Sequence, residues 1–372
     1  MSEGAATVAR VTETLTHGDF DSLTAPLRGE LVAHCYRMLG SVHDAEDQVQ
    51  ETYLRAWRAF GGFEGRSSVR TWMYQIATRT CLTALRQRAR RPMPTGLGTP
   101  AADPAGGIEA NHEIPWLEPL PDAMLAAPGA DPATVAAVKD GVRLAFVAAL
   151  QHLTPLQRAV VILRDVLAFS AAETAQSLDV SVAAANSALQ RARARLNQLP
   201  RVEAGRLEVS DRHKDLLRRF MEAFEAYDTP AVVALLTDDA TWEMPPFPQW
   251  YSGAQAIGTL IRTQCPDEAA DDLRYAPTAA NGQLACAAWF RGPDGVYRAF
   301  QLLVLDLVDA VAGADGVPAT DGPRVRHVSC FFDTALFDTF GLPQVLPPRP
   351  GDRIDPTATP PGDPHRHDRA RP

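Results

Sequence analysis

Residues 31–88 read LVAHCYRMLGSVHDAEDQVQETYLRAWRAFGGFEGRSSVRTWMYQIATRTCLTALRQR, and their apolar side chains recur at helical spacing. The first helical run covers about 23–39, and the second opens at Ser41 or Asp44. A glycine-containing turn at 60–68 separates the second run from a third. We therefore expect three helices that pack against one another.

The two later helices should each have one buried and one polar face. Seven arginines and no acidic residue lie between Arg66 and Arg91, which suggests contact of the third helix with a polyanion. For each residue taken alone, an ordinary solvated helix face remains the alternative. The second helix should bury Ala45, Val49, Tyr53, Ala56, Trp57 and Phe60. The third should bury Val69, Trp72, Met73, Ile76, Ala77 and Leu85, and expose Arg70, Thr71, Tyr74, Gln75, Thr78 and Arg79.

This stretch resembles region 2 of sigma-70 family factors of the extracytoplasmic-function (ECF) type. The resemblance implies that DAEDQVQETYLRAW (44–57) docks on the β′ clamp of RNA polymerase, and that the loop 61–68 with the helix after it opens and reads the −10 promoter element. Such a loop can hold an unstacked base. The implied polymerase-binding residues are Asp44, Asp47, Gln48, Gln50 and Glu51. The implied −10 residues are Phe63, Arg66, Ser67, Ser68, Arg70, Thr71, Tyr74 and Arg79.

Residues 140–199 predict further helices, of which 171–178 and 182–196 have helix-turn-helix spacing. Ser170 and Ser181 are the expected N-caps. The last helix should bury Val182, Ala185 and Leu189.

The stretch 153–196 resembles sigma region 4, which implies contact with the polymerase β flap and reading of the −35 element. Asn186 and Ala188 stand where basic residues are common in that family, so −35 binding is expected to be weak or specialised. The implied −35 residues are Ser181, Ala184, Asn186, Ser187, Gln190, Arg191 and Arg193.

Proline marks the joints of the chain. Nine of the 30 prolines lie in 92–134 and nine more in 343–372, which indicates linker and tail rather than packed structure. Trp116 is unusual for a pure linker and favours some docking, in a polymerase channel or on the chain itself. The expected domains are a tail at 1–18, region 2 at 19–91, an acidic linker at 92–139, region 4 at 140–199, a third domain at 210–343 and a disordered tail at 344–372.

The third domain reads as helices followed by strands, which indicates an α+β cone. Its order and the segment MPPFPQWYSGAQAI (244–257) resemble a SnoaL-like domain. Such cones can enclose a pocket, and Glu243 with His327 could form an acid–base pair there. Strand alternation instead points Glu243 away from its neighbours Trp242 and Met244, so we expect no catalytic residues. The candidate pocket residues are Trp242, Met244, Trp250, Tyr251, Phe290, Phe300 and His327.

Charge and cysteine content narrow the function. The net charge is −9, and residues 207–372 carry the whole acidic excess, so the third domain is expected to contact the arginine-rich sigma regions and regulate them. The five cysteines are scattered, which predicts a reducing cytoplasm, no metal site and no cofactor. No stretch predicts a membrane span or secretory signal.

We therefore expect a multidomain protein with two all-α sigma domains and an α+β SnoaL-like cone. It should be a sigma factor that binds core RNA polymerase and promoter DNA, with a small-molecule ligand or an anti-sigma factor as further partners. The alternatives are a conventional helix-turn-helix regulator, and a SnoaL-type cyclase or isomerase with a DNA-binding appendage.

Overall fold

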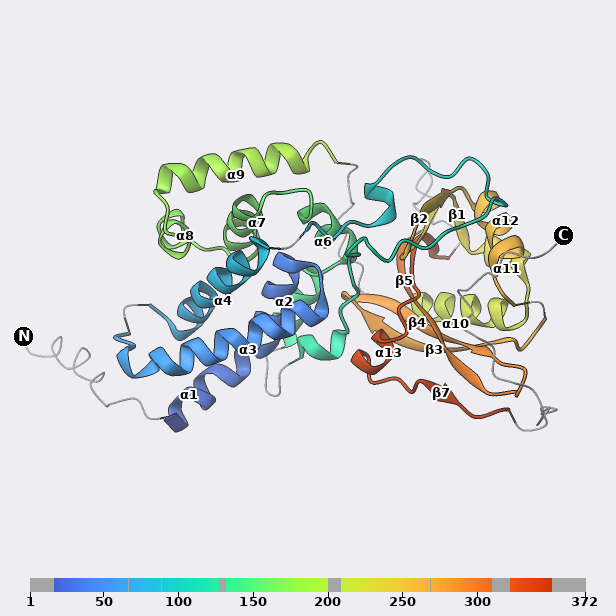
Figure 1. Cartoon of the computed structure of the whole chain (residues 1–372), viewed down its shortest axis with the longest axis horizontal. Coiled ribbons are helices and arrows are strands. Elements are labelled where there is room, and N and C mark those ends of the chain that lie inside the picture. The colour runs from blue at the N-terminus through green and yellow to red at the C-terminus, as the bar shows by residue number, and fades with distance from the viewer. Residues whose placement is uncertain are drawn as a thin grey trace, which may run out of the picture. The chain divides into compact units, whose positions relative to one another are not determined.

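The computed structural model describes residues 17–65, 67–87, 89–126, 132–199, 209–267, 269–309 and 322–349. The chain forms two compact units that interleave along the sequence (Figure 1). The helical unit takes residues 1–91 and 117–204, and the sheet unit takes residues 92–116 and 205–372. We call residues 92–116 the strap. In the described part of the chain, no helix is both long and apolar enough to cross a membrane.

The first helices of the helical unit begin and end at the signals that the sequence carries. Ser41 Oγ accepts a hydrogen bond from the Asp44 amide, and Ser68 Oγ accepts one from the Thr71 amide. One helix ends at Gly40, whose φ of 72° is the left-handed conformation that suits glycine. The bounds are α1 His17–Thr24, η1 Ala25–Leu27, α2 Arg28–Leu39, α3 Val42–Ala59, η2 Phe60–Gly62 and α4 Val69–Leu85.

The later helices of this unit include the predicted helix-turn-helix, formed by α8 and α9. Ser170 and Ser181 cap these helices as expected, and Asp179 makes the turn with a φ of 55°. The prediction that Val182 is buried is wrong: it lies in the first turn of α9 and is 44% exposed. The bounds are η4 Asp122–Leu125, α5 Pro132–Asp140, α6 Leu144–Leu150, α7 Pro155–Val161, a π-helical turn η5 Ile162–Val166, α8 Ala171–Leu178 and α9 Val182–Leu196.

Two buried arginines join the early and late helices of this unit. Arg37 Nε donates to the Gly141 carbonyl oxygen at 2.7 Å, and Arg158 donates to the carbonyl oxygens of Leu150 and Met38. Burial lowers the pKa of each guanidinium to about 10, so both remain charged at neutral pH and donate charge-assisted hydrogen bonds to these carbonyl oxygens.

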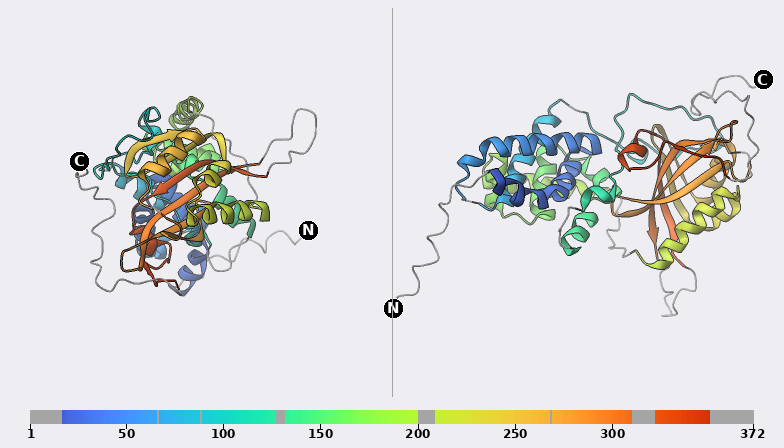
Figure 2. Two further views of the ribbon diagram at one scale, coloured as in Figure 1. Left: turned by 90° about the vertical axis from the view of Figure 1, so that its right-hand side faces the viewer. Right: turned by 90° about the horizontal axis from the view of Figure 1, so that it is seen from below.

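The sheet unit is the α+β structure that the sequence predicts. Its strands run in the order β2-β1-β6-β5-β4-β3, with β1 and β6 parallel and β7 paired to β5. Helix α10 lies across the curved sheet (Figure 2). Its Phe220 and Phe224 rings pack near Trp242. The bounds are η3 Pro94–Gly96, α10 Asp211–Glu225, α11 Thr229–Ala234, β1 Leu236–Met244, β2 Phe247–Ser252, α12 Ala254–Gln264, β3 Leu273–Ala280, β4 Gln283–Arg291, β5 Tyr297–Val308, β6 Arg324–Phe331, α13 Leu336–Thr339 and β7 Val345–Leu346.

The strap is packed, so the expectation of an unpacked linker is wrong for 92–116, and the alternative of docking on the chain itself is the one found. It passes along the edge strand β2, where the Ala101 amide donates to the Trp250 carbonyl oxygen at 2.8 Å and the Asn111 amide donates to the Pro246 carbonyl oxygen at 2.9 Å (Figure 1). Trp116, at its end, is 9% exposed. The strap thus covers an edge that would otherwise offer unpaired main-chain groups.

The two ends of the chain are partly described. The expected N-terminal tail lies outside the described residues up to residue 16, and α1 begins within it at His17. The expected C-terminal tail is packed at its start, because β7 pairs with β5 and Arg349 forms an ion pair with Glu225 at 3.1 Å. The expectation of disorder is therefore wrong for 344–349, and 350–372 lie outside the described residues.

Candidate polymerase, nucleic-acid and ligand surfaces

Helix α3 presents an exposed face that contains most of the predicted polymerase-binding residues. Asp47 and Gln50 are exposed, and Gln48 and Glu51 are partly exposed. Leu54, one helical turn beyond Gln50, is 52% exposed, which is unusual for a large apolar side chain in a packed helix. Sequence reasoning did not single out this leucine, although its spacing from Asp47 places it on the same face.

The residues at the start of α3 are less exposed to solvent than we expected from the sequence. Asp44 pairs with Arg91 at 2.9 Å, and the Asp44 side chain is only 13% exposed, so its assignment to an exposed face is wrong. Beside this pair, the Glu118 carboxylate accepts hydrogen bonds from Ser41 Oγ at 2.8 Å and from the Val42 amide at 3.0 Å. A negative charge at the N-terminus of a helix is favoured by the helix dipole.

Three further expectations about residues of α3 and α4 are corrected by the packing. Trp57 is 38% exposed rather than buried, and its ring packs edge-on against Phe20. Tyr74 is 1% exposed, because its hydroxyl donates to the Glu30 carboxylate at 2.9 Å inside the unit. Thr78 is also fully buried.

The other predicted −10 residues lie around the start of α4. Phe63 packs on Trp72 with ring centroids 5.0 Å apart, and both are partly exposed. Arg70 is exposed and pairs with Glu30. Ser68 caps the helix, so its hydroxyl is already bonded to the Thr71 amide. Ser67 and Thr71 are partly exposed, and Arg66 lies outside the described residues.

Helix α9 exposes every predicted −35 residue. Its buried stripe consists of Ala185, Ala188, Leu189 and Ala192. Ala188 is therefore a core position in this chain, and its expected effect on phosphate contact stays a prediction. The exposed residues are Ser181, Ala184, Asn186, Ser187, Gln190, Arg191 and Arg193.

Two arginines on this exposed face differ in their partners. Arg193 makes a bidentate contact with the Asp165 carboxylate, in which Nε lies 3.0 Å from Oδ2 and Nη2 lies 2.5 Å from Oδ1. Arg191 contacts only the Ser187 hydroxyl, at 2.5 Å, among the described residues. The charge of Arg191 is therefore available to a phosphate or a base edge, whereas that of Arg193 is largely satisfied.

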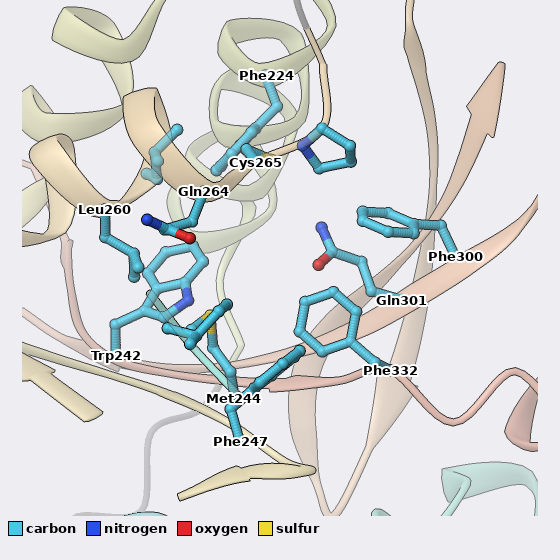
Figure 3. Close-up of a pocket in the computed structure, with 13 residues that line it drawn as sticks. Phe224, Trp242, Met244, Phe247, Leu260, Gln264, Cys265, Phe300, Gln301 and Phe332 are labelled. Carbon is cyan, nitrogen blue, oxygen red and sulfur yellow. The ribbon is translucent and has the colours of Figure 1, made fainter. Parts of the chain in front are cut away.

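The sheet unit contains an apolar cavity of about 50 Å³ between the sheet, α10 and α12. Two carboxamides, those of Gln264 and Gln301, point into it between aromatic rings (Figure 3). Trp242, Met244 and Phe300 line it as predicted. Trp250, Tyr251, Phe290 and His327 do not, since the strap or the sheet core occupies their side of the structure. The complete lining is Ile108, Phe224, Trp242, Met244, Phe247, Leu260, Ile261, Gln264, Cys265, Pro266, Phe300, Gln301 and Phe332.

Glu243 and His327 form a close pair, but not in the cavity. His327 Nε2 lies 2.7 Å from Glu243 Oε1, and Glu243 Oε2 accepts a hydrogen bond from the Thr95 amide of the strap at 3.1 Å. Burial alone would lower the pKa of His327, but the charge and hydrogen bond of Glu243 outweigh it and raise that pKa. Burial alone would raise the pKa of Glu243, yet His327 and Thr95 hold it below its usual value. The pair therefore anchors the strap.

Comparison with known proteins places these surfaces in a family. Family models match as sigma-70 region 2 at residues 23–91, sigma-70 region 4 at 143–196 and a SnoaL-like domain at 217–331. The chain is 54% identical over 331 residues to the ECF RNA polymerase sigma factor SigG of Mycobacterium tuberculosis, covering 88% of this chain and 85% of that one. The chain belongs to the ECF RNA polymerase sigma factors.

A second relative is similar in both sequence and fold. The ECF sigma factor SigJ of Mycobacterium tuberculosis is 33% identical over 221 residues, 58% of this sigma factor and 62% of SigJ. The crystal structure of SigJ has a similar fold, with a TM-score of 0.51 at 23% identity over 87% of this chain and 99% of that one. The chain is thus an ECF sigma factor with a C-terminal SnoaL-like domain.

In this sigma factor, regions 2 and 4 contact each other within the helical unit. The edge of the Tyr74 ring meets Phe169 at 6.0 Å, and Arg90 hydrogen-bonds His152 at 2.9 Å. No periodicity in the sequence could have revealed these contacts, because each lies between helices that are far apart in the chain. Within the described residues, no cluster of histidine, cysteine or acidic side chains could hold a metal ion.

Proposed function

We propose that this sigma factor binds core RNA polymerase through one face of α3, formed by Asp47, Gln50, Glu51 and Leu54. Three polar side chains around one exposed leucine suit a protein interface, where a central apolar contact supplies most of the affinity and polar groups surround it. The polymerase β flap is the proposed partner of region 4. Because transcription takes place in the cytoplasm, the protein acts there.

Promoter recognition, in this proposal, divides between α4 and α9. The loop and first turn of α4 present Phe63, Arg70 and Thr71 to the −10 element, with the Phe63–Trp72 ring pair beside them as a stacking surface. Helix α9 enters the major groove at the −35 element through Asn186, Ser187, Gln190 and Arg191.

The single observation that carries the DNA part of the proposal is the separation of faces on α9. One side of the helix is a stripe of alanines and a leucine held in the core, and the other is exposed and rich in amide, hydroxyl and guanidinium groups. Such groups are the ones that read base edges and hold phosphates.

The SnoaL-like domain, we infer, regulates transcription without chemistry of its own. Glu243 binds His327 and the Thr95 amide of the strap, and the pair does not line the cavity. Burial raises the pKa of the Cys265 thiol at the cavity wall, so this cysteine is not an activated nucleophile. The regulation acts through the strap, which is the first part of the segment between region 2 and region 4. A separate anti-sigma factor is compatible with this arrangement.

In vitro transcription with purified core polymerase tests the proposal. The intact chain should start transcription at a promoter with −10 and −35 elements, and the change Asn186→Ala together with Gln190→Ala should lower initiation at that promoter. The same double change should leave binding to core polymerase unchanged, because α9 is not the proposed polymerase face. Failure of the intact chain to direct initiation at any promoter selected from genomic DNA would contradict the proposal.

A further inference from the structure

The cavity of the sheet unit is closed on one side by the strap rather than by the cone itself. Ile108 lines the cavity, and it belongs to the strap. Gln264, at the end of α12, also lines the cavity, and its Nε2 donates to the strap carbonyl oxygens of Ala105 and Gly106, both at 3.2 Å. Through these two residues, the strap forms part of the cavity wall.

The lining defines the chemistry of an occupant. Five aromatic rings face the cavity, and no charged side chain of the described residues lines it, so a charged molecule would find no counter-ion there. Gln301 is engaged, because its carbonyl oxygen accepts from the Cys330 thiol at 2.8 Å. The amide nitrogen of Gln264 donates its hydrogen bonds to the strap. Its carbonyl oxygen accepts no hydrogen bond from the described residues. A neutral aromatic molecule with a hydroxyl donor matches this set.

The cavity is too small for such a molecule while the strap is in place. Its volume is about 50 Å³, whereas an apolar protein cavity of about 150 Å³ is known to hold a benzene ring. A lining side chain must therefore move. Four of the five aromatic side chains lie on helices or strands of the core, and the fifth, Phe332, packs edge-on against Phe247 and Phe300. Ile108 instead lies on an extended segment next to Gly106 and Gly107 and is only partly buried.

We propose that the cavity binds a neutral, hydroxyl-bearing aromatic ligand that takes the place of the Ile108 side chain and thereby releases the strap from the sheet unit. A ligand and a segment that compete for one space are coupled reciprocally. A change that weakens binding of the strap to the sheet unit therefore raises the affinity for the ligand. The consequence for transcription rests on the proposed function, since the strap joins regions 2 and 4. The binding and release steps do not depend on it.

The test uses the full chain and 2-naphthol, a neutral fluorescent bicyclic phenol. Binding is followed by its fluorescence, and release of the strap by hydrogen exchange at the Ala101 and Asn111 amides, which bond to β2 and the turn before it. We expect 2-naphthol to bind and to speed exchange at both amides. The variant Ile108→Ala should bind it about 5- to 150-fold more tightly, the usual span of such a coupling.

Two controls make the result specific. Leu97→Ala truncates a strap residue that is 47% exposed and does not line the cavity, so it should leave the affinity unchanged. The anion 2-naphthalenesulfonate has the same rings but a charge, and it should bind at least about tenfold more weakly because the lining cannot compensate its desolvation. No binding of 2-naphthol to either the intact chain or Ile108→Ala would overturn the proposal. Binding without faster exchange, or equal tightening by Leu97→Ala, would overturn it as well. None of these measurements involves polymerase, so they can fail while the proposed function stands.

Discussion

Arg79 Nε, on α4, donates a hydrogen bond to the main-chain oxygen of Ser177, 3.2 Å away at the end of α8. The same guanidinium reaches the Gln176 carbonyl oxygen at 3.3 Å. Carbonyl groups at the C-terminus of a helix carry partial negative charge and attract cations. A residue predicted to contact the −10 element is therefore used, in this structure, to hold region 4 against region 2. In the proposed promoter complex, contact with the −10 element and this internal contact would use the same side chain.

The change Arg79→Ala should loosen the packing between regions 2 and 4. Two charge-assisted hydrogen bonds are lost, which costs about 1–3 kcal/mol with allowance for exposure of the arginine. Hydrogen exchange in α8 should become faster by a corresponding factor. Arg86→Ala is the matched control, because Arg86 is exposed near the end of the same helix. Equal exchange in α8 for both variants would show that the Arg79 contact contributes nothing.

The α3 face can be tested by removing its central apolar contact and reversing a charge. The variant Leu54→Ala with Asp47→Arg should co-purify with core polymerase at least about tenfold less efficiently, because it loses the exposed leucine and reverses the nearby charge. Its circular dichroism spectrum should be unchanged, since both side chains are exposed. Asp239→Arg, an exposed position in β1, is the charge control and should bind normally. Unchanged co-purification of the α3 double variant would rule out this face.

The partners of Arg191 and Arg193 predict different roles on DNA. Arg191→Ala should weaken binding to a −35 duplex by about 1–3 kcal/mol if the guanidinium makes a bidentate base contact. Arg193→Ala should weaken it less, because Asp165 already satisfies that guanidinium. Fluorescence anisotropy at several salt concentrations measures both affinities and shows whether either arginine contacts only phosphate. A larger loss for Arg193 would contradict the assignment.

His34 makes the helical unit sensitive to acid. Burial and then the charge of Arg37 lower the pKa of this fully buried imidazole to about 3. Since the folded pKa lies below the unfolded value of 6.5, the stabilisation is complete above pH 6.5 and is lost as the pH falls toward 3. The free energy of unfolding should fall by up to about 1.4 kcal/mol for each pH unit in that range.

The variant His34→Gln should unfold at a lower urea concentration at neutral pH but show a flatter pH dependence below 6.5. Far-ultraviolet circular dichroism during urea unfolding measures this difference. His112→Gln, at an exposed position, is the control and should keep the wild-type slope. An unchanged slope in His34→Gln would mean that another group governs the acid response.

The anchor of the strap predicts the opposite pH dependence in the sheet unit. The pKa of His327 is raised by Glu243, so the charged pair stabilises the folded unit below the ordinary histidine pKa and this contribution is lost as the pH rises through the raised value. Glu243→Gln should speed hydrogen exchange at the Thr95 amide, with an effect that shrinks at high pH. Glu222→Gln, at an exposed ion pair on α10, is the control. Equal exchange at Thr95 in both variants would contradict an anchoring role.

Periodicity predicted the elements well but not the contacts between them. The helix-turn-helix bounds agreed with the sequence, because they follow from local spacing and capping. Strand β2 contains Pro248, which an edge strand tolerates and a central strand would not. Tyr74 was assigned to the outer face by helical phase, whereas Glu30, far away in the chain, draws its hydroxyl inward.

The cavity shows the same limit. Trp242, Met244 and Phe300 were predictable from strand alternation in a cone. Ile108 and Gln264 were not, since one belongs to a segment that the prolines marked as a linker and the other lies at the end of a helix. Only the path of the strap past β2 and the end of α12 brings them together.

The interleaving of the two units changes what it means to remove the SnoaL-like domain. A chain that stops at residue 204 keeps the strap at 92–116 but loses the surface on which the strap lies. Such a truncation leaves Met93 and Ile108 without their packing partners and exposes main-chain groups that were bonded to β2. It therefore differs from the intact sigma factor by a newly exposed segment as well as by the missing domain. The sheet unit thus depends on two distant stretches of the gene, one of them upstream of region 4.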